Sequence, residues 1–296
     1  MRRGRLVLAM IAAALLGEAA AAQQRNVAQV EIKTTPLGEG VSMMEGAGGN
    51  LGVSVGPDGV LLIDDELAPL SDKIKAAIAK LSDRPVKILF NTHYHGDHVG
   101  GNENFGNAGA TIVAHDNVWA RMSQADPLRS LPPYPGPALP LISFRDRITF
   151  HVNGDTLQVI HVPPAHTDGD CFLLFEKANV LHTGDLFFNG RYPFIDVPSG
   201  GSVDGMVAAD EKILALANDR TRIIPGHGPL GDKASLQGFH DMMVQVRDRI
   251  RPLVAAGKTK DEIVAAKPTA DFDETWGKGG AMPERFVGAI VDGWKK

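Results

Sequence analysis

The sequence predicts an α/β (α+β) fold in which two β-sheets pack face to face with helices on their outer sides. The chain contains two successive halves, and each half has short apolar strands followed by amphipathic helices. Because a sheet and a helix each bury an apolar face, this order favours a layered sandwich. The 296 residues, 44% hydrophobic and 22% charged, are enough for one large domain.

The N-terminus has the pattern of a secretory signal peptide. Three arginines precede an apolar run over 6–16, and an A-x-A site follows at 20–22. We therefore expect a signal peptide over 1–22, cleavage after Ala22, and one domain over 23–296 located in the periplasm or secreted. The apolar run is too short for a stable bilayer-spanning anchor, so no membrane association is expected after cleavage, although a retained anchor is the alternative.

The first half begins with short β-like runs separated by glycine-rich turns, which is typical of an antiparallel meander with a mobile hairpin tip at 45–49. A helix follows, capped by Ser71 and Asp72, and its apolar residues share one face. Six prolines between 126 and 140 indicate a surface loop that could overhang a site. The strands are expected at 30–32, 41–44, 50–55, 59–63, 86–90 and 111–113. One helix is expected at 71–81, and another begins near 116.

The second half repeats the order of strands and helices. A turn at 153–155 joins two alternating runs into a hairpin, and longer amphipathic segments come after the strands. The strands are expected at 148–152, 157–162, 171–175, 180–182 and 222–224, and the helices at 203–217, 233–255, 260–266 and 284–294.

Four metal-ligand side chains stand within six residues directly after the strand at 86–90. They are His93, His95, Asp97 and His98, in the segment NTHYHGDHVGG. Several buried imidazoles beside a carboxylate are costly to desolvate unless a cation neutralises them. Imidazole and carboxylate are the ligands expected for zinc or another first-row divalent ion.

Three later segments share one design, in which an apolar strand leads into a ligand on a loop marked by glycine or proline. These ligands are His166, Asp185 and His227. The pattern HxHxDH, then His, Asp and His, resembles the metallo-β-lactamase superfamily over essentially the whole chain after the signal peptide. The resemblance implies a four-layer αββα sandwich, the metallo-β-lactamase fold, with a dinuclear site along one edge.

By matching positions, the resemblance implies that His93, His95 and His166 hold a first metal, and that Asp97, His98 and His227 hold a second. Asp185 would bridge the two ions. The expected cofactors are two Zn²⁺, with iron or manganese as alternatives. His93 and His95 stand two residues apart, so on an extended segment they face the same way, in agreement with this division.

These ligands predict a hydrolase. A metal pair lowers the pKa of water to about 7 and polarises a carbonyl, so a bound hydroxide would attack an amide, ester, lactone or thioester. Asp97 is expected to be catalytic, because it can orient the hydroxide or accept its proton. The expected partner is a small molecule with a carbonyl group.

The residue type at position 185 helps to distinguish possible substrates. The best-known antibiotic-hydrolysing members that begin with HxHxDH have Cys or Ser at this position, whereas Asp resembles the hydroxyacylglutathione and lactone hydrolases. β-Lactam hydrolysis nevertheless stays open, since an exported protein meets β-lactams. Two further alternatives are a di-iron oxidoreductase on the same fold and a non-catalytic metal-binding protein.

The aromatic segment 187–196 is expected either to cover the site, with Asn189, Arg191 or Tyr192 binding substrate, or to pack in the core. His182 is expected either to orient a ligand or to be a plain strand residue. The remaining histidines lack a ligand-like context and are expected to be structural or exposed: His115, His151, His161 and His240.

Composition excludes other classes. The formal net charge is −5 and no Lys/Arg stripe alternates with aromatics, so nucleic acid is not an expected partner. Cys171 is the single cysteine and lies in an apolar run, which predicts a buried inert thiol. The sequence leaves the oligomeric state open.

Overall fold

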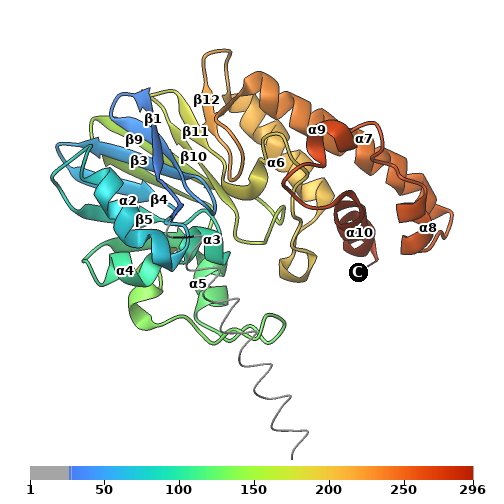
Figure 1. Ribbon diagram of the computed structural model, residues 1–296, viewed down its shortest axis with the longest axis horizontal. Coiled ribbons are helices and arrows are strands. Elements are labelled where there is room, and N and C mark those ends of the chain that lie inside the picture. The colour runs from blue at the N-terminus through green and yellow to red at the C-terminus, as the bar shows by residue number, and fades with distance from the viewer. Residues whose placement is uncertain (1–26, 28, 296) are drawn as a thin grey trace, which may run out of the picture.

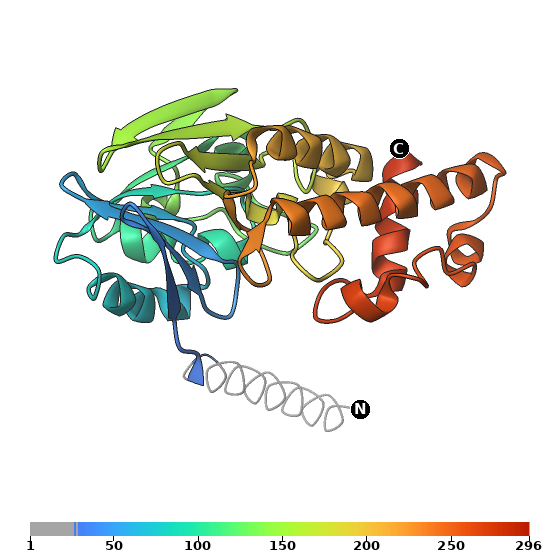
Figure 2. The same cartoon turned by 90° about the horizontal axis from the view of Figure 1, so that it is seen from above.

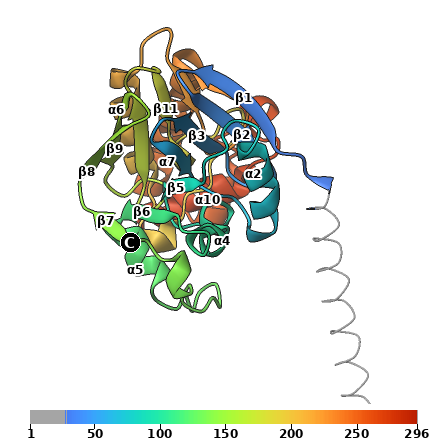
Figure 3. The ribbon, with the colours of Figure 1, turned by 90° about the vertical axis from the view of Figure 1, so that its left-hand side faces the viewer.

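A computed structural model describes residue 27 and residues 29–295. The chain forms two β-sheets that face each other, with helices on both outer sides (Figure 1). Viewed from the side, helix α6 (Val203–Leu216), the second sheet, the first sheet and helix α2 (Ser71–Ile78) succeed one another as four layers (Figure 3). The four-layer αββα sandwich expected from the sequence is confirmed.

The first sheet has seven strands in chain order. Its first four strands form an antiparallel meander, and the last three add in parallel. The parallel pairs need crossovers, which the helices supply. The strands are β1 (Lys33–Gly38), β2 (Val41–Glu45), β3 (Leu51–Gly56), β4 (Gly59–Ile63), β5 (Val86–Phe90), β6 (Thr111–His115) and β7 (Ile142–Phe144).

The second sheet has six strands in the order β13-β12-β11-β10-β9-β8. Its pairs are antiparallel except for β11 with β12, which are parallel and joined through α6. The strands are β8 (Arg147–Val152), β9 (Asp155–His161), β10 (Cys171–Phe175), β11 (Val180–His182), β12 (Arg222–Ile224) and β13 (Gly231–Asp232).

The apolar core lies between the two sheets and on the outer side of each. Between the sheets, Phe90 and Val113 of the first sheet meet Leu173 and Phe175 of the second, all almost fully buried. Outside the first sheet, α2 contributes Ile74 and neighbouring residues to a second cluster. The short helices α3 (Gly96–Val99), α4 (Asn102–Gly106) and α5 (Asp116–Met122) lie on the same side, near the strand ends.

Helix α7 (Lys233–Ala255) packs with α6 over the second sheet, and its N-terminus is held by a capping box between Asp232 and Ser235. Beyond it the chain is helical, and this part projects past the sheets (Figure 2). It comprises α8 (Lys260–Ala265), α9 (Asp273–Trp276) and α10 (Pro283–Trp294). No helix in the described part of the chain is long and apolar enough to cross a membrane.

Two local predictions were wrong. The first strand lies at Lys33–Gly38 instead of 30–32, because residues 33–38 pair with β2 whereas 30–32 do not enter the sheet. Ser71 does not cap its helix but is its first residue, since its hydroxyl donates to the Ala68 carbonyl of the preceding 3₁₀ turn (Ala68–Leu70). The predicted signal peptide over 1–22 lies outside the described residues.

Candidate metal centre

The seven predicted ligands converge at the ends of four strands. The strands β5, β9, β11 and β12 each lead into one of the ligand-bearing loops. Two groups form there, and within each group the ligand atoms lie within 4.8 Å of one another. One group is His93, His95, His166 and Asp185, and the other is Asp97, His98 and His227.

The first group turns three imidazole nitrogens toward one point. His93 Nε2 lies 3.1 Å from His95 Nδ1, which lies 2.9 Å from His166 Nε2. The Oδ2 atom of Asp185 is 3.7 Å from His93 Nε2 and 3.3 Å from His166 Nε2. Such a convergence of nitrogen and oxygen donors suits a divalent transition metal.

The second group shares Asp185 with the first. Its Oδ1 atom lies 3.1 Å from His98 Nε2 and 3.3 Å from His227 Nε2, and Asp97 Oδ2 lies 3.3 Å from His227 Nε2. Asp185 therefore presents one carboxylate oxygen to each group. Among the described residues its buried Oδ1 accepts no hydrogen bond, so the residues present fit a cation between them.

The outward-facing nitrogens of three of the histidines are bound by other protein groups. Asp64 Oδ2 is 2.7 Å from His98 Nδ1, Asp196 Oδ2 is 2.9 Å from His95 Nε2, and the Phe194 carbonyl accepts from His166 Nδ1 at 2.6 Å. Contacts of this kind fix the ring orientation and the tautomer of a metal ligand. They leave the opposite nitrogens free to face the metal positions.

The charges within the cluster set the pKa values of its carboxylates. Burial alone would raise the pKa of Asp185, but His227, His98 and two further imidazoles hold it well below the usual range. Burial likewise opposes ionisation of Asp97, yet His98 and His227 lower its pKa to about 2. Burial lowers the pKa of His93 well below its usual value. Against the effect of burial, the neighbouring carboxylates, Asp185 first, raise the pKa of His227 to about 9 and that of His98 well above its usual value, so both rings must lose a proton when a cation binds.

Glycines allow the backbone to approach the cluster. A Cβ at Gly49 would lie 2.2 Å from His98 Cε1, and a Cβ at Gly226 would lie 2.0 Å from Asp185 Oδ1. The hairpin tip at 45–49 was expected to be mobile, but hydrogen bonds hold it against the cluster. Its Gly48 N–H donates to Glu66 at 2.6 Å, and Gly49 N–H donates to the Asp97 carbonyl.

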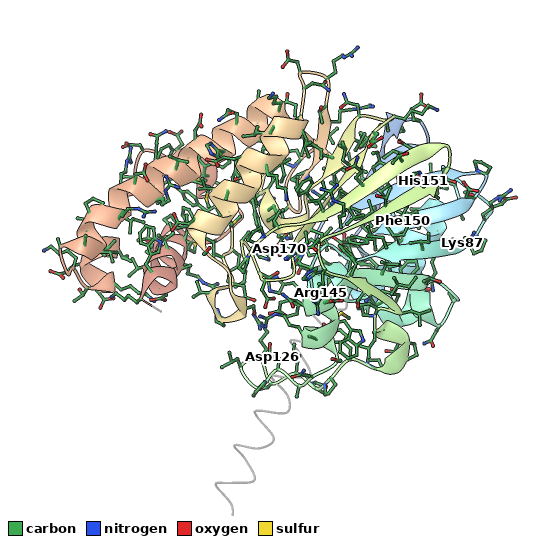
Figure 4. All side chains as sticks on the ribbon, turned by 180° about the vertical axis from the view of Figure 1, so that it is seen from behind. Lys87, Asp126, Arg145, Phe150, His151 and Asp170 are labelled. Atoms are coloured by element: carbon green, nitrogen blue, oxygen red, sulfur yellow. The ribbon has the colours of Figure 1, made fainter. Side chains whose placement is uncertain are left out.

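A pocket of about 330 Å³ opens onto Asp97, Asp185 and His227. One wall is the proline-rich loop at 126–140, which overhangs the site as the sequence suggested. Figure 4 shows Asp126, where this loop begins, at the lower edge of the molecule below Asp170. The remaining wall residues are Tyr94, His95, Gly96, Arg121, Gln124, Arg129, Leu131, Pro132, Tyr134, Phe188 and Phe194.

Sequence reasoning missed the loop residues of this wall. Tyr134 packs its ring beside Val99 and Met122, and its hydroxyl lies 4.0 Å from the position of a Cβ at Gly96. Arg129 donates to Asp126 and to Asp196. The only signal in the sequence was the cluster of prolines, which marked the loop but not its inward-facing residues.

The structure directs the three expected substrate-binding side chains away from the pocket. Tyr192 is fully buried, and its hydroxyl donates to Asp273 at 2.9 Å. Arg191 donates to the Gly279 carbonyl and Asn189 to the Pro229 carbonyl. Only Phe188 and Phe194 of this segment face the pocket, because the chain between them turns toward the C-terminal helices.

The other histidines take structural positions. His182 is buried, and its Nδ1 accepts from the Gly184 N–H at 3.2 Å, so it supports the turn that carries Asp185. His115 and His161 stack with ring centroids 3.7 Å apart. Cys171 is buried, and burial raises the pKa of its thiol well above the usual value, in agreement with an inert thiol.

The chain belongs to the metallo-β-lactamase superfamily, whose family model matches residues 47–227. Members of the superfamily bind metal, typically zinc, and they include hydrolases. The matched segment contains all seven residues of the two groups.

Individual relatives are distant. A hydroxyacylglutathione hydrolase of Nitrosococcus oceani is 29% identical over 54% of this chain and 55% of its own length. A linear primary-alkylsulfatase of a Pseudomonas species is 22% identical over 70% of this chain and 48% of its own. The chain thus spans about half the length of these curated relatives.

Solved structures share the fold at low identity. A metallo-β-lactamase from Pontibacter korlensis matches with a TM-score of 0.61 at 18% identity, over 72% of this chain and 99% of that one. The sec-alkylsulfatase Pisa1 from a Pseudomonas species matches with a TM-score of 0.68 at 17% identity, over 88% of this chain and 50% of that one.

Proposed function

We propose that this protein is a metal-dependent hydrolase that opens an amide, ester, lactone or thioester of a small molecule at a dinuclear, zinc-type centre. The observation that carries the proposal is the position of Asp185, whose two oxygens each face one of the two ligand groups. A carboxylate placed in this way suits two cations side by side. The relatives, which include a hydroxyacylglutathione hydrolase, support hydrolysis as the reaction class.

In this proposal His93, His95 and His166 hold one ion, Asp97, His98 and His227 hold the other, and Asp185 binds both. When bound, the pair would supply a water with a pKa of about 7 and polarise the carbonyl of the substrate. The protein fixes the imidazoles through their outer hydrogen bonds and excludes bulk water from the strand ends.

Asp97 has the position of a catalytic carboxylate. Its side chain is 36% exposed, whereas that of Asp185 is only 5% exposed, so Asp97 is the more accessible of these two carboxylates at the pocket. With its pKa lowered to about 2, Asp97 is ionised at neutral pH and can orient a water molecule or accept its proton.

The first test measures metal content and turnover together. Protein freed of metal with a chelator is reloaded with zinc, manganese or iron, quantified by mass spectrometry, and assayed on nitrocefin, an aryl lactone, a glutathione thioester and an alkyl sulfate. We expect about two ions per chain and hydrolysis of at least one carbonyl substrate. Fully loaded protein that turns over none of them would refute the proposal.

Variants separate the roles of the two carboxylates. Asp185→Ala should reduce the metal content, and Asp97→Ala should reduce kcat by about 10²-fold or more even when excess zinc restores its metal content. Asp219→Asn, at an exposed carboxylate outside the site, is the matched control and should behave as the wild type. Full metal content in Asp185→Ala would exclude a bridging role.

We also propose that the protein is exported and acts in the periplasm or outside the cell, because of the pattern at 1–22. Cell fractionation with N-terminal sequencing tests this. Mature protein beginning at Gln23 is the expected result, and an uncleaved protein in the cytosolic fraction would contradict it.

A further inference from the structure

Large exposed apolar side chains gather at the mouth of the metal pocket. Leu128 is 79% exposed, Leu131 is 44% exposed and Phe194 is 41% exposed. Leu131 and Phe194 line the metal pocket, while Leu128 and Phe194 line the groove beside it. Exposed apolar groups that adjoin one another mark a binding surface more often than scattered ones do.

The neighbouring groove holds about 610 Å³ and runs from the proline-rich loop to helices α8 and α10. Its lining includes the apolar side chains of Ile195, Val197, Val264 and Ala289. Phe194 and Arg129 line both this groove and the metal pocket, so the two hollows adjoin at these side chains.

The charged side chains nearest the metal pocket already form ion pairs with one another. Arg121 donates two bonds to Asp168, each of 2.7 Å, and Arg129 donates to Asp126 and Asp196. Farther out, Lys260 of the groove donates to Asp292 at 2.6 Å, and the remaining charged side chains are exposed and of both signs: Asp261, Glu284 and Arg285. A substrate anion would therefore have to break an existing ion pair to gain an inner partner.

We propose that the groove binds the apolar, uncharged tail of the substrate whose carbonyl lies at the metal centre. The inference rests on the proposed function and names its substrate class: carbonyl compounds with an alkyl or aryl tail and no anionic group. Leu128, Leu131 and Phe194 cover the tail where it leaves the metal pocket, and the segment 195–197 with α10 receives it.

Chain length provides the first test. We expect kcat/KM of the metal-loaded protein to rise about two- to fourfold per methylene from p-nitrophenyl acetate through the butyrate to the hexanoate. The half-ester of a dicarboxylic acid with the same tail length should be a poor substrate. A flat chain-length series, or equal turnover of the anionic half-ester, would overturn the inference.

Matched variants locate the effect. The double variant Leu128→Ser and Leu131→Ser should flatten the chain-length series, so that hexanoate turnover falls more than acetate turnover. Leu141→Ser with Leu216→Ser is the control, because Leu141 is 79% exposed and Leu216 is 42% exposed, outside the groove. In a second variant, Ala289→Phe should fill the groove and lower hexanoate turnover selectively. An unchanged series in both variants would contradict the proposal.

A binding measurement separates this inference from the proposed reaction. Metal-free protein is titrated by NMR with 2-octanone, and with octanoate and octyl sulfate as anions of similar tail length. Ketone binding that is weakened in the Leu128/Leu131 variant, without hydrolysis of any ester, would support the tail-binding groove and contradict the proposed hydrolysis. Ester hydrolysis without tail-dependent binding or turnover would support the proposed hydrolysis and contradict the tail-binding groove.

Discussion

The carboxylate of Asp196 joins the proline-rich loop to a metal-ligand histidine: its Oδ2 atom lies 2.9 Å from His95 Nε2 and 2.6 Å from Arg129 Nη2. Tyr94 donates to the same oxygen at 2.8 Å. Burial would raise the pKa of Asp196, but the bonds from His95 and its other partners hold it well below the usual range. One anion therefore orients His95 and anchors the pocket wall.

Asp196→Asn should weaken metal binding by about 10–100-fold, because His95 loses the anion that fixes its ring. Competition with a chromophoric chelator measures the change. Asp168→Asn is the control, since Asp168 binds the other arginine of the pocket wall, Arg121, and does not contact His95. Equal metal affinity in the two variants would show that Asp196 does not position His95.

Tyr134→Phe should lower kcat/KM by about tenfold, the effect of removing one hydrogen bond to a bound substrate. Its hydroxyl faces Gly96 at the pocket, and among the described residues it has no hydrogen-bond partner. The ring and the Tyr134 N–H to Met122 contact remain, so the melting temperature should not change. Unchanged kinetics with an unchanged melting temperature would remove Tyr134 from the reaction.

The pair of stacked histidines should make stability depend on pH. Burial, then repulsion from His115, lowers the pKa of His161 to about 4. In the unfolded chain His161 should titrate at about 6.5, so the folded state resists protonation and loses stability as the pH falls from about 6.5 to 4. The loss should be on the order of 2 kcal/mol, measured by urea unfolding.

NMR titration of the His161 ring checks the cause directly. A midpoint near 4 is expected, and His115→Phe should raise it because the neighbouring charge is removed while the stacking remains. A midpoint near the unfolded value in the wild type would contradict the assignment.

Asp210 should destabilise the protein at neutral pH. It lies fully buried on α6, and among the described residues neither carboxylate oxygen has a hydrogen-bond partner. Burial raises its pKa well above the usual value, so its favourable contribution exists at low pH and is lost as the pH rises. Asp210→Asn should raise the free energy of unfolding at pH 7 by about 1–3 kcal/mol.

The neighbouring Glu211→Gln is the matched control, because that side chain is 64% exposed and its substitution should change the free energy of unfolding by less than about 0.5 kcal/mol. Urea unfolding from acidic to neutral pH compares the two variants. A difference between wild type and Asp210→Asn that does not grow with pH would show that folding does not raise the pKa of Asp210.

The layers and the candidate metal-ligand residues could be predicted from the sequence alone. Short apolar runs bounded by turn residues define strands locally, so β4, β8, β10, β11 and β12 were predicted to within a residue. The seven ligands stand in short motifs directly after strands, and strand ends of one sandwich meet at one edge. Their convergence could therefore be inferred without coordinates. Their role as metal ligands stays a prediction.

The surroundings of the metal positions depend on packing between distant parts of the chain. The segment containing Asn189 and Tyr192 is close to Asp185 in sequence, yet packing against Asp273 and Phe286 turns Tyr192 into the core. Tyr134 and Arg129 lie on a loop without periodicity, whose path depends on contacts with Met122 and Asp196. Ligand residues follow from local motifs, whereas pocket walls depend on long-range packing, which no local pattern encodes.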